Sequence, residues 1–249
     1  MKNVAIITGA SSGFGKALAL KLNKYFSVDE IWLIARRKER LQTLAEEITV
    51  PTKILPLDVT DEKDVEKLQN LLKEESPYVK VLINNAGLGY YGDFKDMNTE
   101  KIDKMINVNV LALTKITSVC LPYTGEGGRI LNFSSIASFV PNAYMSVYSS
   151  TKAYVPSFSR ALNYALKEKK IKCSIVCPGP METEFEKVGE VTSRKFMRLP
   201  FCKVEKVAKG ALKSLKKGKF IYTNRFVYKF YRVLAKILPQ SWLMKTASC

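Results

Sequence analysis

The stretch Val4-Ala-Ile-Ile-Thr-Gly9-Ala-Ser-Ser-Gly-Phe-Gly15 decides the fold, because an apolar strand pattern runs directly into a glycine-rich turn and then a helix pattern. Glycines in such a turn let the backbone bend tightly and approach a pyrophosphate, which then lies at the amino terminus of the helix. Glycines also end strands for purely steric reasons, but this position between a first strand and a first helix favours a dinucleotide site. The candidate residues in the turn are Gly9, Ser11, Ser12, Gly13, Phe14 and Gly15.

The rest of the body repeats this alternation of short apolar runs and helix patterns. Strands that are apolar on both faces and separated by helices are typical of a parallel sheet with helices on both sides. The sequence therefore predicts an α/β fold with a doubly wound, seven-stranded parallel sheet of the Rossmann type. The predicted strands are 4–8, 31–35, 53–57, 81–84, 130–133, 171–177 and 220–223. The predicted helices are 14–26, 38–48, 61–73, 101–120, 146–169 and 204–216.

The end of the second predicted strand indicates which dinucleotide binds. An acidic residue there would accept hydrogen bonds from a ribose 2′-hydroxyl, whereas arginine accommodates a 2′-phosphate. The sequence reads Ala35-Arg36-Arg37-Lys38, with no carboxylate before Glu39. Because guanidinium groups bind phosphate through paired, charged hydrogen bonds, NADP is favoured over NAD. The alternative is that Arg37 and Lys38 simply begin a solvated helix.

Composition excludes several classes of enzyme. The 249 residues contain no histidine, so Ser-His-Asp hydrolysis and His-dependent zinc chemistry lack their usual agent. The five cysteines have no metal-type spacing, and no metal site is expected. We predict a cytoplasmic protein, because the sequence has an odd number of cysteines, no secretory segment and no apolar run of about 20 residues.

The net charge of +17 is concentrated near the carboxyl terminus. Residues 203–249 contain 12 Lys and Arg against one acidic residue, Glu205, whereas residues 1–202 carry only +6. Within 224–238, Lys229, Arg232 and Lys236 lie on one face of a predicted helix. Its apolar positions are Phe226, Phe230, Val233, Leu234, Ile237 and Leu238. Such a helix can lie on an anionic membrane surface, pack onto the body or form a subunit interface. Nucleic acid is an unlikely partner, because no recognised binding module interleaves with the charge.

Further motifs make the chain resemble a single-domain short-chain dehydrogenase/reductase of the NADP-preferring type. The resemblance extends from residue 1 to about residue 222, and the motifs occur in the order found in the family. They are Thr8-Gly9-x3-Gly13-x-Gly15, Asp58, Asn84-Asn85-Ala86-Gly87, Asn109, Ser135, Tyr148-x3-Lys152 and Pro178-Gly179-x3-Thr183. Each motif is short, but the ordered set is very specific.

The resemblance implies a role for each of these residues. Asp58 and Val59 would contact the adenine, and Asn85, Ala86 and Gly87 would line the adenosine ribose. The nicotinamide ribose and carboxamide would be held by Pro178, Gly179 and Thr183. The implied catalytic tetrad is Asn109, Ser135, Tyr148 and Lys152. Tyr148 and Lys152 would also contact the cofactor.

Physical chemistry agrees with these implied roles. A tyrosine hydroxyl has a reference pKa of about 10, and we expect the ammonium of Lys152, four residues further along one helix, to lower it with the help of the positively charged oxidised nicotinamide. Ser135 would hydrogen-bond the substrate oxygen, and Asn109 would hold a water that relays protons. Tyr144 and Tyr154 compete with Tyr148, but neither has a lysine four residues later.

Pro156 should kink or strain the helix that carries Tyr148 and Lys152, because it has no N–H for the carbonyl of Lys152. A kink there would also affect the packing of subunits through this helix. It removes no catalytic group.

The resemblance also implies a domain layout. Residues 1–223 would form one catalytic domain, with a lid over the substrate at about 180–203, followed by a basic amphipathic tail at 224–249. The family usually forms dimers or tetramers through the helices at 101–120 and 146–169. Apolar residues in the lid and nearby segments favour a lipid-, steroid- or acyl-like carbonyl substrate, although the same residues could simply anchor the lid. They are Phe196, Met197, Leu199 and Phe201, with Tyr90, Tyr91, Phe139 and Val140 as possible walls. The alternatives are a catalytically silent cofactor-binding scaffold or redox sensor, and a peripheral membrane protein.

Overall fold

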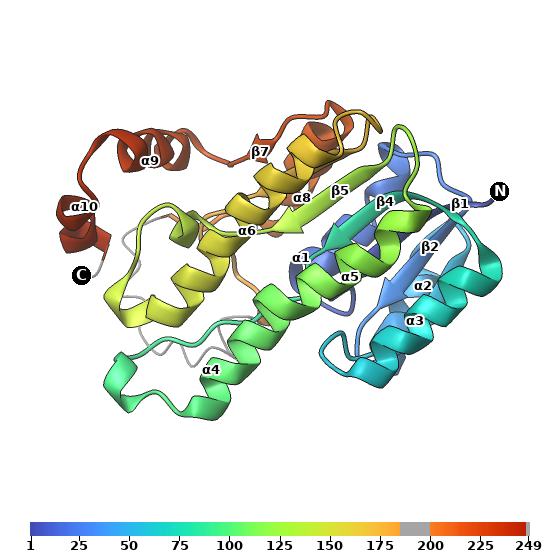
Figure 1. Cartoon of the computed structure of the whole chain (residues 1–249), viewed down its shortest axis with the longest axis horizontal. Helices are drawn as coiled ribbons and strands as arrows, with labels where there is room; N and C mark the ends of the chain where they lie inside the picture. Colours follow the sequence, from blue (N-terminus) through green and yellow to red (C-terminus); the bar gives the residue numbers. More distant parts are fainter. Residues whose placement is uncertain (185–199, 248–249) are drawn as a thin grey trace.

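A central parallel sheet organises the molecule, and the computed structural model describes residues 1–184 and 200–247, with side chains to residue 245. Figure 1 shows the sheet with one group of helices in front of it and another behind. The seven strands lie in the order β3-β2-β1-β4-β5-β6-β7, which confirms the predicted fold class. They are β1 (Asn3–Thr8), β2 (Glu30–Ile34), β3 (Thr52–Leu55), β4 (Tyr78–Asn84), β5 (Arg129–Phe133), β6 (Lys172–Val176) and β7 (Ile221–Tyr222).

The strand order reverses at β1, which pairs with β2 on one side and β4 on the other. Ile7 is in register with Leu33 and Ile83, so the ends of these three strands lie side by side. In open α/β sheets, ligands bind at the carboxyl ends of the strands next to such a reversal. The glycine-rich turn that follows β1 is therefore at the expected place for a ligand.

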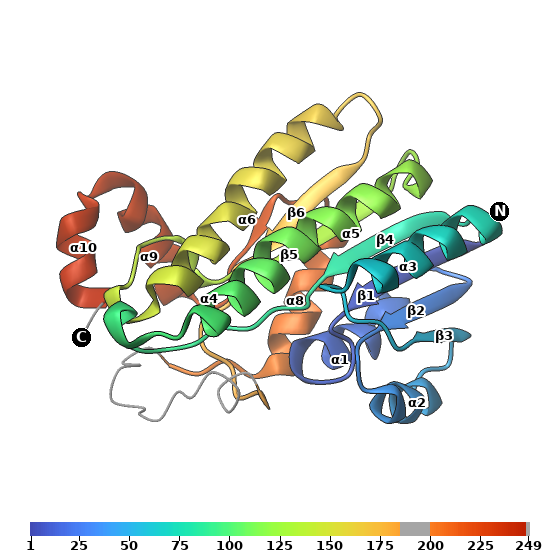
Figure 2. The same cartoon turned by 60° about the horizontal axis from the view of Figure 1, so that its bottom comes forward.

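Two layers of helices cover the sheet, and Figure 2 shows them on opposite faces. One layer shares a buried apolar cluster with the odd-numbered residues of β1, and the other with the even-numbered ones. The first layer holds α1 (Gly13–Ala19), α2 (Lys38–Glu46) and α8 (Val204–Lys216). The second holds α3 (Glu62–Glu75), α4 (Thr99–Ile106), α5 (Leu113–Cys120) and α6 (Ser146–Ala165). Because Val4 and Ile6 face one layer while Ala5 and Ile7 face the other, both faces of β1 are buried.

A π-helical segment, η3 (Asn107–Ala112), joins α4 to α5. The helix is therefore continuous over Thr99–Tyr123, and its mean hydropathy reaches 1.4 over 18 residues. By length and composition alone it could cross a membrane, which differs from the expectation that no apolar run is long enough. In the fold its inner face packs on the sheet through Ile116 and Cys120, as the core helix of a folded domain does.

Two predicted helices differ in extent from the observed ones. The helix expected over 14–26 ends at Ala19, and tighter 3₁₀ turns at η1 (Leu22–Lys24) follow. These turns allow both Leu22 and Phe26 to enter the core. The helix expected over 146–169 ends at Ala165, but Pro156 does not interrupt it.

Two helices follow β7, namely α9 (Phe226–Ile237) and α10 (Gln240–Ala247). Figure 1 shows them beyond the end of the sheet toward which the strands point, far from the amino terminus. The carboxyl-terminal helices therefore lie at the same end of the molecule as the carboxyl ends of the strands.

Candidate active site

The glycine-rich turn is held against the end of β4 by steric contacts that leave no space for side chains. Gly9 and Gly13 have positive φ angles of 66° and 51°, which L-residues rarely adopt. A Cβ on Gly15 would lie 2.2 Å from the carbonyl oxygen of Gly9 and 2.5 Å from Asn85 Nδ2. That amide in turn donates hydrogen bonds to the carbonyls of Thr8 and Gly9, each at 3.1 Å.

The backbone amides of Asn85 and Ala86 both donate to Thr8 Oγ1, at 3.0 and 3.1 Å. Thr8 thus joins the ends of β1 and β4. Ser12 precedes α1 without a side-chain cap, and Phe14 at the start of this helix is buried. The backbone N–H groups of this turn are of the kind that binds phosphate, so the turn fits a dinucleotide.

Arginine side chains from the segment after β2 extend over this turn. Arg37 Nη2 donates to Ser11 Oγ and Ser12 Oγ, at 3.2 and 3.0 Å. Arg37 and Arg40 also form ion pairs with Glu184, at 3.0 and 2.5 Å. These two arginines, Arg40 first, hold the pKa of the Glu184 carboxyl below its usual range. The arrangement creates a cationic cluster beside the glycine turn.

Arg36 points elsewhere, although the sequence made it the stronger phosphate candidate. Its side chain is 79% exposed, and its Nη1 lies 3.8 Å from Asp58 Oδ2. Asp58 Oδ1 accepts hydrogen bonds from the backbone amide and hydroxyl of Thr60, at 2.9 and 2.7 Å. Val59 follows in the same loop and is half-buried beside the apolar cluster that contains the even-numbered residues of β1. Arg37, and not Arg36, therefore contacts the turn.

Tyr148 and Ser135 meet at the carboxyl ends of β5 and β6. Tyr148 lies in the first turn of α6 and is 5% exposed, and its hydroxyl is hydrogen-bonded to the Ser135 side chain. Ser135 follows β5 directly and caps a short 3₁₀ turn, accepting a hydrogen bond from the Ala137 amide at 3.2 Å. The competing tyrosines lie away from this pair: Tyr144 stacks on Tyr91, and the Tyr154 hydroxyl contacts Thr114 Oγ1.

Lys152 extends beneath Tyr148 and is almost completely buried. Its Nζ donates to the carbonyl of Phe133 at 3.2 Å and lies 5.8 Å from the centre of the Tyr148 ring. Gly87 lies against it, because a Cβ at this glycine would be 3.1 Å from Lys152 Nζ and 3.0 Å from Asn109 Oδ1. The lysine and the asparagine therefore lie on two sides of the small space that the missing side chain of Gly87 leaves.

The π-helical segment directs Asn109 to this space. Asn109 is 1% exposed, and its Nδ2 donates to the carbonyl of Leu88 at 2.7 Å and to Thr151 Oγ1 at 3.0 Å. Its Oδ1 accepts from the Leu88 amide at 3.0 Å. Thr151 also donates to the carbonyl of Tyr148, so one hydroxyl connects Asn109 to the helix that carries Tyr148 and Lys152. π-Helical turns of this kind often occur at functional sites.

Burial controls the ionisation of the pair. It raises the pKa of Tyr148 to about 12, which the hydrogen bond with Ser135 opposes only in part. It also lowers the pKa of Lys152 to about 7, because desolvation in the buried site disfavours the charged ammonium. The expected lowering of the Tyr148 pKa by Lys152 is therefore not seen in the polypeptide alone. Desolvation raises the pKa of Tyr148, and Lys152 does not offset this rise, because burial also favours the neutral form of Lys152.

The carbonyl of Lys152, which Pro156 leaves without a helical donor, accepts a hydrogen bond from Ser134 Oγ at 2.9 Å. The missing helical donor is thus replaced by a side-chain hydroxyl from the segment after β5. The sequence analysis selected Ser135 and did not find this role for its neighbour Ser134. Asking which group satisfies the carbonyl four residues before the proline would have found it.

The segment after β6 covers the other side of the site. The carbonyl of Pro178 accepts a hydrogen bond from the Ile136 amide at 3.1 Å. A Cβ on Gly179 would lie 2.3 Å from the ring of Tyr228 on α9, and one on Gly13 would lie 3.4 Å from Thr183. Thr183 is therefore next to the glycine turn, and the tail contacts the site directly. Most of the predicted lid, including Phe196, Met197 and Leu199, lies outside the described residues.

The predicted substrate walls are only partly brought together. The Phe139 ring lies 6.4 Å from that of Tyr231 on α9, and Val140 is buried. Tyr91 stacks on Tyr144, and Tyr90 lies under the ammonium of Lys101. Phe139, four residues after Ser135, is therefore in contact with the tail through Tyr231. Tyr231 was not selected from the sequence, because no local pattern relates it to Phe139.

Comparisons with known proteins agree with this geometry. The family model described as short chain dehydrogenase matches residues 3–192. The chain is 37% identical over 194 residues to sulfoacetaldehyde reductase 2 of Chromohalobacter salexigens, covering 74% of this chain and 75% of that one. It is 36% identical over 198 residues to a very-long-chain 3-oxoacyl-CoA reductase of Anas platyrhynchos, covering 75% of this chain and 62% of that one.

Solved structures share the fold over nearly the whole chain. A short-chain dehydrogenase from Sphingobium yanoikuyae in complex with NADPH superposes with a TM-score of 0.81 at 28% identity, covering 98% of this chain and 95% of that one. The bulky-bulky ketone specific alcohol dehydrogenase from Comamonas testosteroni gives a TM-score of 0.76 at 26% identity, covering 98% and 94%. The match to these structures includes the carboxyl-terminal region that the family model leaves unmatched.

Proposed function

This chain belongs to the short-chain dehydrogenase family and is an oxidoreductase, and from that premise we propose that it reduces the carbonyl group of an apolar substrate with NADPH. The observation that carries the proposal is the convergence of Tyr148, Ser135 and Lys152 at the carboxyl ends of the central strands. A hydroxyl pair beside a buried ammonium is suited to proton transfer at a carbonyl oxygen. NADPH, when bound, supplies the hydride.

Tyr148 would donate the proton to the substrate oxygen. Burial in the polypeptide alone raises its pKa to about 12, so the phenol holds its proton at neutral pH, and Ser135 and Lys152 would have to stabilise the phenolate as that proton leaves. Ser135 would donate a hydrogen bond to the same oxygen and stabilise the charge that develops on it. Once Tyr148 has lost its proton, the phenolate would attract a proton to Lys152 Nζ, and the resulting ammonium would stabilise it.

Asn109 is a positioning residue in this proposal. Its amide is bonded to Leu88 and Thr151, and only the space at Gly87 separates its Oδ1 from Lys152 Nζ. A water held there would return protons from solvent to Lys152. The hydrogen bonds to Leu88 fix the amide orientation that this role requires.

For the cofactor we propose NADP(H), held over the glycine turn of Gly9, Gly13 and Gly15. The residues present fit such a group, because the turn has backbone angles and close contacts that exclude side chains. Arg37 would bind the 2′-phosphate together with Ser11, since the two are already in contact. Glu184 would have to release Arg37 for that phosphate, or the phosphate would have to be shared with Arg40. Three of the similar solved structures contain NADPH or NADP and two contain NAD or NADH, so both cofactors occur among them and the preference for NADP(H) rests on Arg37.

For the substrate we propose a large apolar ketone or acyl carbonyl. Support comes from the aromatic contact of Phe139 with Tyr231, close to Ser135 in the chain. It also comes from relatives named for a very-long-chain 3-oxoacyl-CoA and for a bulky-bulky ketone. A small charged aldehyde is the second candidate, because an equally similar relative is a sulfoacetaldehyde reductase.

The test is NADPH oxidation followed by absorbance over a panel of carbonyls. The panel contains a 3-oxoacyl thioester, a steroid ketone, a diaryl ketone and sulfoacetaldehyde. Tyr148→Phe should lower kcat by about 100-fold or more, because general acid catalysis contributes that much. Tyr154→Phe is the matched control, since this tyrosine is on the same helix but contacts Thr114. Full turnover in Tyr148→Phe would overturn the mechanism, and preference for sulfoacetaldehyde would overturn the substrate class.

A further inference from the structure

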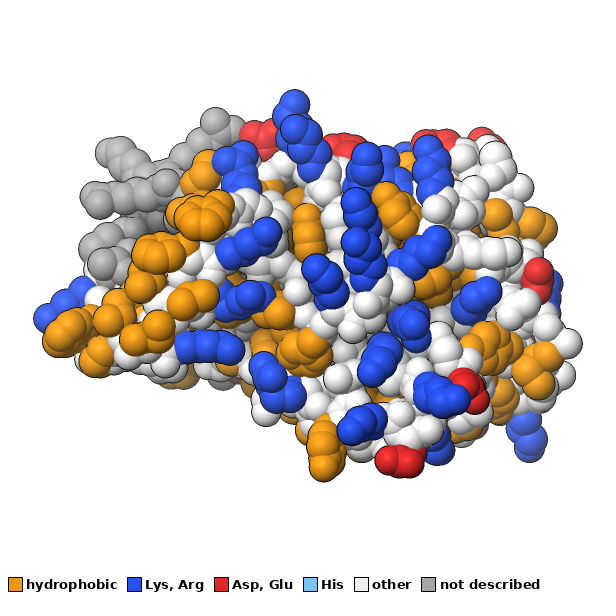
Figure 3. Space-filling view, turned by 90° about the horizontal axis from the view of Figure 1, so that it is seen from above, with side chains coloured by type: hydrophobic (Ala, Val, Ile, Leu, Met, Phe, Trp, Pro, Cys, Tyr) orange, Lys and Arg blue, Asp and Glu red, His pale blue; other side chains and the backbone are white. Residues whose placement is uncertain are grey.

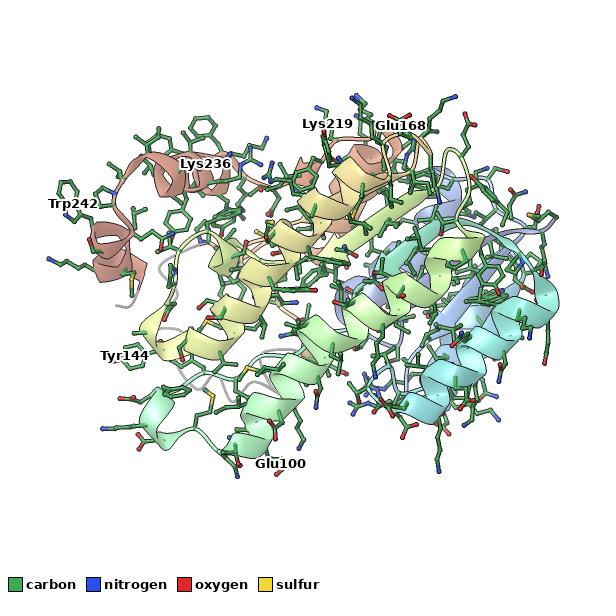
Figure 4. The ribbon with its side chains drawn as sticks, in the orientation of Figure 1. Glu100, Tyr144, Glu168, Lys219, Lys236 and Trp242 are labelled. Carbon is green, nitrogen blue, oxygen red and sulfur yellow. The ribbon has the colours of Figure 1, made fainter. Side chains whose placement is uncertain are left out.

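Helix α9 presents an apolar stripe to solvent. Phe226, Phe230, Val233 and Ile237 follow one another at intervals of four, three and four residues, which places them on one helix face. Their exposed fractions lie between 47% and 82%. On α10, Trp242 is 63% exposed, and Figure 4 shows it at the outer edge of the molecule, pointing away from the body. Large apolar side chains gathered in this way indicate an interaction surface.

The opposite face of α9 fixes this orientation. Tyr228 is fully buried against Gly179, and its hydroxyl donates to the carbonyl of Pro200. Tyr231 packs against Phe139, and Arg225 Nη2 donates to the carbonyl of Phe201 at 2.6 Å. The helix cannot rotate its apolar stripe inward without losing these contacts. The stripe therefore stays on the surface of the folded protein.

The surroundings of the stripe are strongly basic. No aspartate or glutamate occurs after Glu205, whereas 11 lysines and arginines do. Lys229 and Lys236 lie on α9 itself and are exposed. Figure 3 shows apolar side chains gathered at one end of this face of the molecule and Lys and Arg side chains spread beside them, with few acidic ones. The apolar stripe and the positive charge thus share one side of the protein.

We propose that α9 and α10 dock this protein onto an anionic lipid bilayer. A helix with an apolar face and flanking lysines is suited to lie at a membrane interface, with apolar side chains among the acyl chains and ammonium groups at the lipid phosphates. A second copy of the chain would instead bring two sets of like charges together. An anionic surface complements both properties at once.

Docking in this way would bring the active site to the membrane. The inner face of α9 contacts Gly179 and Phe139, and these residues adjoin the proposed nicotinamide and substrate positions. An apolar carbonyl compound dissolved in the bilayer could then enter from the membrane side. This last step depends on the proposed function, whereas the docking itself does not.

Flotation of the full-length protein with vesicles tests the proposal. We expect binding to vesicles of phosphatidylcholine with 30% phosphatidylglycerol, at least about tenfold weaker binding to phosphatidylcholine alone, and release at high salt. Tryptophan emission should shift to the blue on binding, because Trp242 is exposed whereas Trp32, the other tryptophan, is buried.

Two pairs of variants separate the apolar and the charged contributions. Phe230→Ser with Ile237→Ser should weaken vesicle binding about tenfold or more, while Tyr164→Ser, an exposed aromatic on α6, should not change it. Lys229→Gln with Lys236→Gln should weaken only the binding to anionic vesicles. Lys167→Gln with Lys169→Gln, at two exposed lysines that follow α6, is the matched control.

Several outcomes would overturn the docking proposal. The first is that folded protein does not float with vesicles, and the second is equal binding to both vesicle types. The third is that Phe230→Ser/Ile237→Ser lowers the mass of an oligomer measured by light scattering but leaves vesicle binding unchanged. The last result would assign the stripe to a second copy. Turnover of a water-soluble carbonyl without vesicles is measured in parallel. Vesicle binding without any turnover would reject the proposed function and leave the docking intact.

Discussion

The cofactor end and the substrate end of the candidate active site are built in different ways. At the cofactor end, Gly9, Gly15 and Asn85 contact one another through backbone atoms and one short amide. At the substrate end, Gly179 is covered by the ring of Tyr228, a side chain from a helix about 50 residues further along the chain. The first end can accept almost no change, whereas the second can be reshaped by changing side chains. The difference suits a protein family with a common cofactor and varied substrates.

Glycine substitutions should separate the two ends with the largest effect. Gly15→Ala places a Cβ 2.2 Å from a backbone oxygen, so we expect a loss of more than about 3 kcal/mol in the free energy of unfolding, or no folded protein. Gly179→Ala meets the Tyr228 ring at 2.3 Å and should cost about 2–3 kcal/mol. Urea denaturation measures both.

A second substitution makes that comparison decisive. Tyr228→Ala should recover part of the stability lost in Gly179→Ala, so that the two changes are non-additive. It should recover nothing in Gly15→Ala. Additive losses in the pair of Gly179 and Tyr228 would mean that the ring does not limit the space there.

Cofactor affinity is expected to show the next largest effect. Arg37→Ala should weaken NADPH binding by about 100-fold and NADH binding only slightly, because a buried or partly buried charge-assisted contact contributes about 2–3 kcal/mol. Arg36→Ala is the matched control, since Arg36 is directed toward Asp58 and is largely exposed. Titration of cofactor fluorescence gives both affinities. A larger loss in Arg36→Ala would reverse the assignment.

The buried lysine between the two ends should give stability a characteristic pH dependence. Folding lowers the pKa of Lys152 to about 7. Between about pH 7 and pH 10, the unfolded chain therefore still holds a proton on this lysine that the folded protein has lost. Stability therefore gains from this group as pH rises through that window. Lys152→Met removes the cost of the buried charge. Its free energy of unfolding should exceed that of the parent protein most, by about 2 kcal/mol, at pH 6–7.

The advantage of Lys152→Met over the parent protein should shrink as pH approaches 10. Lys167→Met, at an exposed site, should show no such trend. Thermal denaturation at several pH values distinguishes them, and a constant difference across the range would contradict the lowered pKa.

The smallest expected effect is at the contact of Ser134 with Lys152. Ser134→Ala leaves a buried carbonyl without its donor and should cost about 1–2 kcal/mol. Pro156→Ala restores a helical N–H four residues after Lys152, so the double variant should regain part of that loss. If Pro156→Ala gives no recovery, the serine acts through another contact, such as its hydrogen bond with Cys177.

The sequence predicted much of the fold and the grouping of the site, because both depend on local signals. The glycine turn, the apolar strands and the four-residue spacing of Tyr148 and Lys152 are each visible within a few residues, and the predicted fold class and family are confirmed. Contacts between distant segments were not accessible in this way. Arg37 was distinguished from Arg36 only by side-chain direction, and Tyr228 only by its contact with Gly179.

Ionisation of the pair depends on more than the local sequence. A lysine four residues from a tyrosine, together with the oxidised nicotinamide, suggested a lowered phenol pKa; burial in the polypeptide alone raises it to about 12, and the effect of the cofactor stays a prediction. Burial depends on everything that packs around the pair, including Gly87 and Asn109, and no local pattern reports it. The roles assigned to the site residues stay predictions until the variants above are measured.

The proline in α6 has a mechanical consequence. Since the carbonyl of Lys152 is hydrogen-bonded to Ser134 and not to the next turn of its own helix, the continuous helix has one backbone hydrogen bond fewer at that point and should bend there more easily. Bending of the distal half of α6, for instance when a neighbouring subunit binds there, would be absorbed at Pro156. The lysine would keep its position while the rest of the helix adjusts.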